Sequence, residues 1–232
     1  MHTHPHSTVF AMTPSSCRAV LRELKALSNP DNVAGMARFG INSKNTYGIS
    51  IPTLRSIANE LGKNHELALQ LWRSGVHEAR ILASMIDIPE YVSGRQMDWW
   101  VEDLDSWDVC DQCCSNLFDK TAHAYRKAIE WSSRREEFVK RAGSALMAAL
   151  AAHDKSAGDR EFGRFLKIIE REPDDERNFV KKSVNWALRQ IGKRDVSLRR
   201  AAIATANRIR RRNSRAARWI ASDALRELRN RS

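Results

Sequence analysis

The sequence has few residues that interrupt helices. Its 232 residues include only 10 glycines and 6 prolines, whereas alanine, leucine, arginine, lysine and glutamate are abundant. These abundant residues favour helices, and no alternation of apolar and polar residues is long enough to indicate a β-sheet. The composition therefore predicts an all-α protein.

Long apolar runs are also absent. No stretch approaches the roughly 18 uncharged apolar residues of a membrane-spanning helix. The first sixteen residues have neither a charged start nor a sustained apolar run, so we expect no secretory signal. We predict a cytoplasmic protein without a membrane partner, with a flexible leader at 1–15 and one domain at 16–232.

Cysteine is scarce, and three of the four cysteines crowd into one predicted helix. The side chains of Cys110, Cys113 and Cys114 suit mutual packing better than disulfides, so we expect reduced thiols. A zinc site would need a second Cys or His pair at ligand spacing, and none is evident. The histidines of the leader could bind metal only weakly. We expect no metal and no cofactor.

Acidic residues are outnumbered by basic ones. The chain has 39 Lys or Arg against 28 Asp or Glu, a net charge of +11. Between Lys193 and Ser232 there are thirteen basic residues and three acids, a local charge of +10. This excess indicates a polyanionic partner, and nucleic acid is the commonest one. The alternative is a solvated cationic end that aids solubility.

Apolar residues recur at helical spacing in short segments separated by polar joints. The predicted helices cover 16–27, 32–39, 51–61, 65–74, 77–86, 93–102, 107–118, 121–131, 136–153, 159–170, 176–191, 197–210 and 214–229.

An internal repeat organises these helices. The segment FVKRA at Phe138–Ala142 returns 41 residues later as FVKKS at Phe179–Ser183. A period near 40 with two helices per unit is typical of HEAT-like or armadillo-like solenoids. The second helix of each pair would line a concave face. Lys140 and Arg141 would then lie on the turn of one inner helix that corresponds to the turn of Lys181 and Lys182 on the next. The predicted fold is an all-α solenoid with a concave cationic face.

One short motif could carry chemistry. In the segment SWDVCD, Trp107 and Asp111 are four residues apart and share a helical face, which Asp108 borders. Asp105 or Ser106 is a plausible N-cap. The structural alternative is that acids favour helix starts and that tryptophan packs in cores.

A second group combines a tryptophan with two cations. Trp186 lies four residues after Lys182 and three before Arg189, so the three side chains can face one way. Such a face suits stacking against a sugar or base while the cations hold phosphates. A tryptophan in an Ala/Leu-rich helix is also a common core residue.

These motifs together resemble the bacterial DNA alkylation repair glycosylases of the AlkD type, which are built from HEAT-like repeats. The resemblance runs from about Met36 to the end of the chain. It is carried by MARF (Met36–Phe39), GISIPTLR (Gly48–Arg55), SWDVCD (Ser106–Asp111), FVKRA (Phe138–Ala142) and FVKKSVNWALRQ (Phe179–Gln190).

The resemblance implies a set of site residues. The catalytic group would comprise Asp111, Trp107, Arg141 and Trp186, with Arg141 holding a phosphate near the lesion. Phe39 departs from the family pattern, because the matching position can carry tyrosine. Contacts to DNA would come from Arg55, Lys140, Lys181, Lys182, Arg189, Lys193 and Arg194.

The implied reaction is hydrolysis of the N-glycosidic bond of positively charged N3- or N7-alkylated purines in duplex DNA, a step of base excision repair. The charged base leaves as a neutral molecule, and Asp111 would stabilise the cationic sugar and orient water. We expect a monomer in the bacterial nucleoid that needs no protein partner.

Three alternatives remain at this level. The chain could be a non-catalytic member of the same fold that binds distorted or branched DNA, since a fold does not guarantee chemistry. It could be a helical scaffold for protein partners, although the basic residues at matching positions of the predicted concave face disfavour that. RNA binding is compatible with the charge. The absence of a β-sheet pattern excludes the common RNA-binding modules that stack bases on strands.

Overall fold

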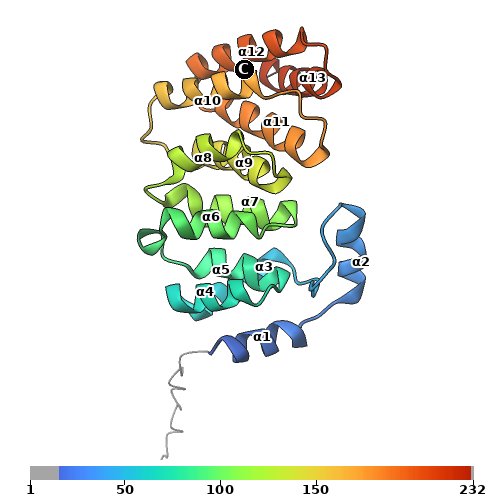
Figure 1. Ribbon diagram of the computed structural model, residues 1–232, viewed down its shortest axis with the longest axis vertical. Helices are drawn as coiled ribbons and strands as arrows, with labels where there is room; N and C mark the ends of the chain where they lie inside the picture. The colour runs from blue at the N-terminus through green and yellow to red at the C-terminus, as the bar shows by residue number, and fades with distance from the viewer. Residues whose placement is uncertain (1–15, 231–232) are drawn as a thin grey trace, which may run out of the picture.

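The computed structural model describes residues 16–230, and within them the chain is all-helical (Figure 1). The prediction for residues 1–15 lies outside the described part. The helices are α1 (Cys17–Ala26), α2 (Pro30–Arg38), α3 (Ile51–Leu61), α4 (His65–Arg73), α5 (His77–Ile86), α6 (Gly94–Glu102), α7 (Trp107–Asn116), α8 (Ala124–Ser132), α9 (Glu137–His153), α10 (Asp159–Arg171), α11 (Asn178–Gly192), α12 (Val196–Arg210) and α13 (Arg215–Arg229), with 3₁₀ turns η1 (Pro89–Tyr91) and η2 (Phe118–Lys120).

Local sequence signals set most helix ends. The side chains of Ser50 and Asn64 are N-caps that accept hydrogen bonds from amides of the first turn. Gly62 ends α3 with a φ of 67°. Three predicted starts differ by two or three residues: α2 begins at Pro30 and not at residue 32, α8 at Ala124 and not at 121, and α11 at Asn178 and not at 176. Proline in the first turn loses no helical hydrogen bond, and the side chain of Asn29 accepts the amide of Asn32.

The helices stack in two series, as expected for HEAT-like repeats. The inner series is α3, α5, α7, α9, α11 and α13, in which each helix packs on the next. Four outer helices, α4, α8, α10 and α12, each pack on the inner helix that follows them in the chain. Figure 1 shows the resulting column, from α1 at one end to α13 at the other. The predicted fold class is confirmed.

The internal repeat places matching residues side by side. The rings of Phe138 and Phe179 stack with centroids 5.7 Å apart, and the next residues, Val139 and Val180, are both buried. The repeat copies are therefore the first turns of adjacent inner helices, α9 and α11, in register. This register determines which side chains of one unit reach the next.

Large aromatic side chains pack α4, α6, η2 and α8 against one another. Trp72 and Trp100 stack at 4.1 Å, and Phe118 and Trp131 continue this cluster. The cysteines of α7 are buried free thiols, as predicted. No helix of the described chain is long and apolar enough to cross a membrane.

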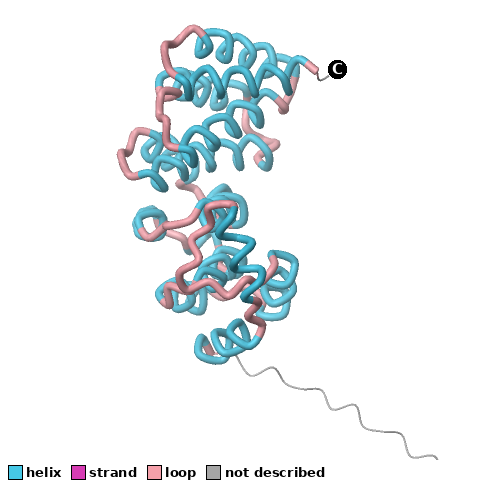
Figure 2. Tube along the Cα trace, turned by 90° about the vertical axis from the view of Figure 1, so that its right-hand side faces the viewer, coloured by secondary structure: helices cyan, strands magenta, loops and turns pink. Residues whose placement is uncertain are grey.

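One helix stands apart from the column. In Figure 1, α2 lies beside the stack at the level of α3, and Figure 2 views that side. The buried carboxylate of Glu78 holds the loop after α2, because it accepts the amides of Tyr47, Gly48 and Ile49. This loop and α2 complete one wall of the candidate site.

Candidate active site

A cavity of about 670 Å³ lies between α2 with its loop and the first turns of the inner helices. Its walls are largely apolar, and several polar side chains converge on the α7 side. The lining residues are Asp31, Asn32, Gly35, Met36, Phe39, Ile41, Gly48, Ile49, Ser50, Ile51, His77, Ile81, Trp107, Asp108, Asp111 and Gln112. Concave apolar walls with a few polar groups are typical of ligand sites.

Asp111 is held in this wall by Arg141. The guanidinium donates from Nε and Nη2 to Oδ1, at 3.1 and 2.9 Å, and from Nη2 to Oδ2 at 2.7 Å. The remaining Nη1 donates to the carbonyl of Phe179 at 2.7 Å. The side chain of Arg141 is only 6% exposed, whereas that of Asp111 is 20% exposed. Arg141 therefore orients the carboxylate from inside the protein, while Asp111 faces the cavity.

The environment of Asp111 changes its proton affinity. Burial raises the pKa of the Asp111 carboxyl, and the charge and hydrogen bonds of Arg141 oppose this without cancelling it. A carboxylate that is costly to ionise gains most from a cation that forms next to it. The site is therefore suited to stabilise a developing positive charge.

Trp107 forms the edge of the same site. Its indole N–H donates to the carbonyl of Phe39 at 3.1 Å, and the guanidinium of Arg141 lies 5.8 Å from its ring centroid. Gly40 follows with a φ of 73°, where a Cβ atom would lie 2.9 Å from the ring of Phe179. The end of α2 is thus fixed between α7 and α11, while the Phe39 side chain is 75% exposed.

A buried pair behind the site has no obvious sequence signal. His77 Nε2 lies 2.8 Å from Asp108 Oδ2, and the Ser106 hydroxyl donates to Asp108 Oδ1 at 2.6 Å. Ser106 is at the N-cap position as expected, but its side chain makes no capping bond. Asp108 therefore ties α7 to α5. Because His77 and Asp108 are 31 residues apart, only the register of the inner helices brings them together.

Trp186 is not among the residues that line this cavity. It is partly buried on α11 and packs against the core. Among residues 16–230, no ring contact joins Trp186 to Trp107. The structure thus brings together three of the four predicted catalytic residues.

Three predicted DNA-binding cations are placed where a phosphate could reach them. Arg55 and Lys182 are exposed, and no ion pair engages either within the described chain. Lys181 lies 5.6 Å from the ring of Trp219, which is itself 40% exposed.

The other four cations have partners inside the protein. Lys140 pairs with Glu172 at 3.0 Å, while Arg189 and Lys193 both pair with Glu227. Arg194 donates to three main-chain carbonyls, those of residues 151, 154 and 157. These four side chains link neighbouring repeats instead of projecting from the surface.

Comparison with known proteins was made for the whole chain. The family model for the DNA alkylation repair enzyme matches residues 20–228. The chain belongs to this family. A solved structure aligns with a TM-score of 0.76 and 19% identity over 92% of this chain and 95% of its own. That protein is described as one of a new family related to the HEAT-like repeat DNA glycosylases with affinity for branched DNA structures. The likeness shows the HEAT-like fold.

The similarity to a curated relative covers less of the chain. An uncharacterized protein of Listeria innocua is 28% identical over 125 residues, which is 52% of this chain. The chain matches only 56% of that protein's length. The match of this chain to the family model, at residues 20–228, includes every helix that contributes to the candidate site.

Proposed function

We propose that this protein is a DNA glycosylase that hydrolyses the N-glycosidic bond of positively charged N3- or N7-alkylated purines in duplex DNA. The observation that carries the proposal is the Asp111 carboxylate, oriented by Arg141 beside Trp107 on the wall of an accessible cavity. Membership of the DNA alkylation repair family supports the same chemistry.

The chemistry needs little beyond an anion. An alkylated purine with a positive charge leaves as a neutral base, so the leaving group requires no strong acid. The sugar left behind has oxocarbenium character, and a carboxylate at about 4 Å stabilises it by roughly 4 kcal/mol at an effective dielectric near 20. This amounts to about a thousandfold in rate. Asp111 also accepts a proton from the attacking water.

The structure changes the role proposed for Arg141. Its donors point to Asp111 and to the Phe179 carbonyl, and its side chain is nearly buried. We therefore assign Arg141 to positioning the carboxylate, and not to holding a phosphate. Trp107 would contact the deoxyribose, since its ring borders the cavity and its N–H is occupied by Phe39.

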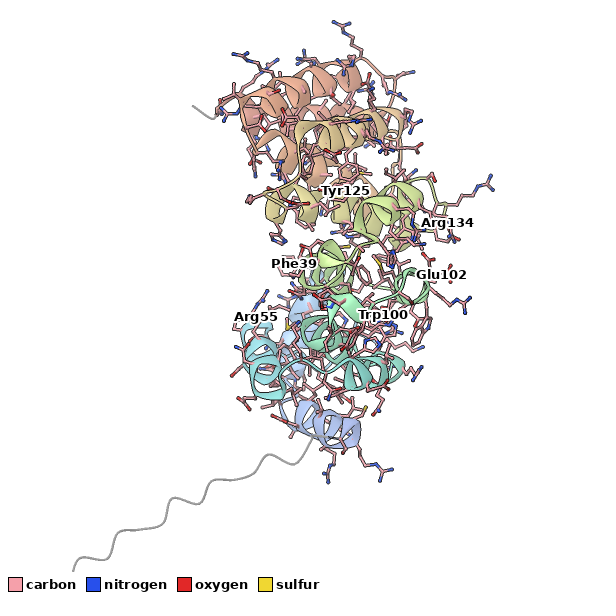
Figure 3. All side chains as sticks on the ribbon, turned by 90° about the vertical axis from the view of Figure 1, so that its left-hand side faces the viewer. Phe39, Arg55, Trp100, Glu102, Tyr125 and Arg134 are labelled. Carbon is pink, nitrogen blue, oxygen red and sulfur yellow. The ribbon has the colours of Figure 1, made fainter. Side chains whose placement is uncertain are left out.

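The first prediction tests the carboxylate. Asp111→Asn should slow the release of 7-methylguanine from methylated duplex DNA by about a hundredfold to a thousandfold, because the anion is lost. The matched control is Glu102→Gln, which removes an exposed carboxylate on the opposite edge of the molecule from Arg55 (Figure 3). Chromatography of the released bases measures the effect, and thermal denaturation checks folding. Equal release by Asp111→Asn and the wild type would refute the proposal.

A second candidate function is non-catalytic binding of branched DNA. The observation that favours it is that both oxygens of Asp111 accept from Arg141, an arrangement that a purely structural ion pair would share. The protein of similar fold is described as having affinity for branched DNA. If the wild type releases no base but binds a four-way junction more tightly than a duplex, this second function replaces the first.

A further inference from the structure

A second cavity lies on the inner face, at the opposite ends of the same helices. Its volume is about 480 Å³. The first cavity is lined by the starts of α3, α5 and α7, whereas this one is lined by their last residues and the joints that follow. We call it the basic pocket, and its lining residues are Arg55, Ala58, Asn59, Gly62, Lys63, Met85, Asn116 and Lys120.

The lining of the basic pocket is cationic. Arg55, Lys63 and Lys120 contribute three positive charges, Asn59 and Asn116 contribute two amides, and no lining residue is acidic. Arg55 is exposed and carries no ion pair within residues 16–230. The amide hydrogens of Asn116 already donate to Ser84 and Gln112. Three cations and the amide of Asn59 around one hollow match the chemistry of a phosphate group.

The backbone fixes the two lysines in place. Lys63 Nζ donates to the carbonyls of Met85 and Asp87, at 2.8 and 2.9 Å, at the end of α5. Lys120 Nζ donates to the carbonyls of Asn116 and Ser115, at 2.5 and 3.2 Å, at the end of α7. An ammonium has three N–H groups, so each lysine keeps one donor for a ligand.

The two ammonium groups affect each other. Burial lowers the pKa of Lys63, and the positive charge of Lys120 lowers it further, against the opposing effect of Asp87 and Glu90. Asp119 approaches Lys120 at 3.7 Å, but its side chain is only 1% exposed. An anion bound between the lysines would relieve their repulsion.

A hydrogen bond connects the basic pocket to the candidate active site. Asn116 Nδ2 donates to Gln112 Oε1 at 3.0 Å, and Gln112 lines the first cavity. Asp111 precedes Asn116 by five residues, which is about 7.5 Å along the helix. The two cavities are therefore joined by one helix, α7.

We propose that the basic pocket binds a backbone phosphate of the DNA strand whose damaged nucleotide faces Asp111. The inference rests on the proposed function for its substrate, and it adds Lys63, Lys120 and Asn59 to Arg55 as the groups that hold the strand in register.

The test uses two variants that leave the capping lysines intact. Arg55→Gln removes one cation, and Asn59→Asp adds an acid to the basic pocket. The matched control is Gln70→Glu, which makes the same amide-to-acid change at an exposed site on the outer helix α4. Affinity for an unmodified duplex is measured by fluorescence anisotropy from about 50 to 200 mM salt.

The expected result is specific to the basic pocket. Arg55→Gln and Asn59→Asp each weaken duplex binding about tenfold at low salt, and each lowers the salt slope by up to about 0.9. Gln70→Glu binds as the wild type does. Base release by Gln70→Glu stays at the wild-type rate, because this change lies on the outer helix α4 and leaves Asp111 untouched.

Other outcomes separate the possibilities. Wild-type affinity and slope in both variants would overturn the inference, and base release by the wild type would still support the proposed function. If inorganic phosphate stabilises the wild type but not Arg55→Gln while duplex binding is equal, the pocket takes free phosphate and the DNA assignment fails. If the wild type binds DNA but releases no base, only the glycosylase proposal is refuted. The comparison of DNA binding by the variants still tests whether the basic pocket binds a phosphate.

Discussion

At the scale of single residues, the buried pair of His77 and Asp108 makes stability depend on pH. Burial lowers the pKa of His77, but the hydrogen bond and charge of Asp108 raise it by more, so the net direction is upward from 6.5. Burial raises the pKa of Asp108, but His77 and Ser106 lower it by more, so the net direction is downward from 3.8. Both shifts favour the charged pair.

The sign of the pH effect follows from these directions. A raised pKa in the folded state means that the contribution of His77 is complete below pH 6.5 and is lost as pH rises through its folded value. The lowered pKa of Asp108 means that its contribution is present above about pH 4 and is lost as pH falls. The pair therefore stabilises the fold most in the weakly acidic range.

The residue-scale prediction concerns His77→Gln. The free energy of unfolding of the wild type should fall relative to that of the variant as pH rises above 6.5, because only the wild type loses the charge on residue 77. Urea denaturation at a series of pH values measures the difference. Parallel curves for the two proteins would show that the pKa of His77 does not differ between the folded and unfolded states, and would refute the prediction.

At the scale of elements, the contact between α8 and α9 depends on one glycine. A Cβ atom at Gly143 would lie 2.4 Å from the backbone nitrogen of Ser132, so the two helices approach too closely for any side chain there. Gly163, in α10, has nothing within 4 Å of the same position. Both residues lie inside helices, which makes them a matched pair.

The element-scale prediction uses this pair. Gly143→Ala should destabilise the protein by about 1 to 3 kcal/mol or more, because backbone atoms must move apart. Gly163→Ala should stabilise it by about 0.5 to 1 kcal/mol through helix propensity alone. Thermal or urea denaturation gives both values. Stabilisation by Gly143→Ala would mean that α8 and α9 are not packed as described.

At the scale of the whole molecule, the repeat register decides which cations are free. Several basic residues of the C-terminal region pair with acids of the preceding unit: Arg208 with Glu170, and Arg212 with Asp174. The local charge of +10 is thus partly neutralised in the fold. The number of available cations is smaller than the sequence implies.

The whole-molecule prediction compares two lysines of adjacent inner helices. Lys182→Gln should lower the salt slope of DNA binding by up to about 0.9 and leave stability unchanged, because Lys182 is exposed. Lys140→Gln should instead cost about 1 to 3 kcal/mol of stability, because it leaves Glu172 and Asp175 without this partner. Denaturation and salt-dependent binding measure the two effects. Equal loss of DNA affinity in both variants would contradict this division.

Periodicity and local signals were enough to predict most of the fold. Apolar spacing located the helices, because it depends on neighbours within one or two turns. The repeat at Phe138 and Phe179 predicted their stacking, because each copy carries the same local pattern. The shared face of Trp107 and Asp111 followed from the same four-residue spacing. These properties are local, so the amino-acid sequence alone determines them.

Only the tertiary structure decided which partner each charge meets. The ion pair of Asp111 with Arg141 spans 30 residues, and that of Lys140 with Glu172 spans 32. The hydrogen bond from the Trp107 indole to the Phe39 carbonyl, which holds the end of α2, joins residues 68 positions apart. Whether a cation faces another helix or solvent depends on the stacking of whole repeats, because electrostatic contacts act through space and not along the chain. Local sequence patterns therefore do not predict these long-range partners.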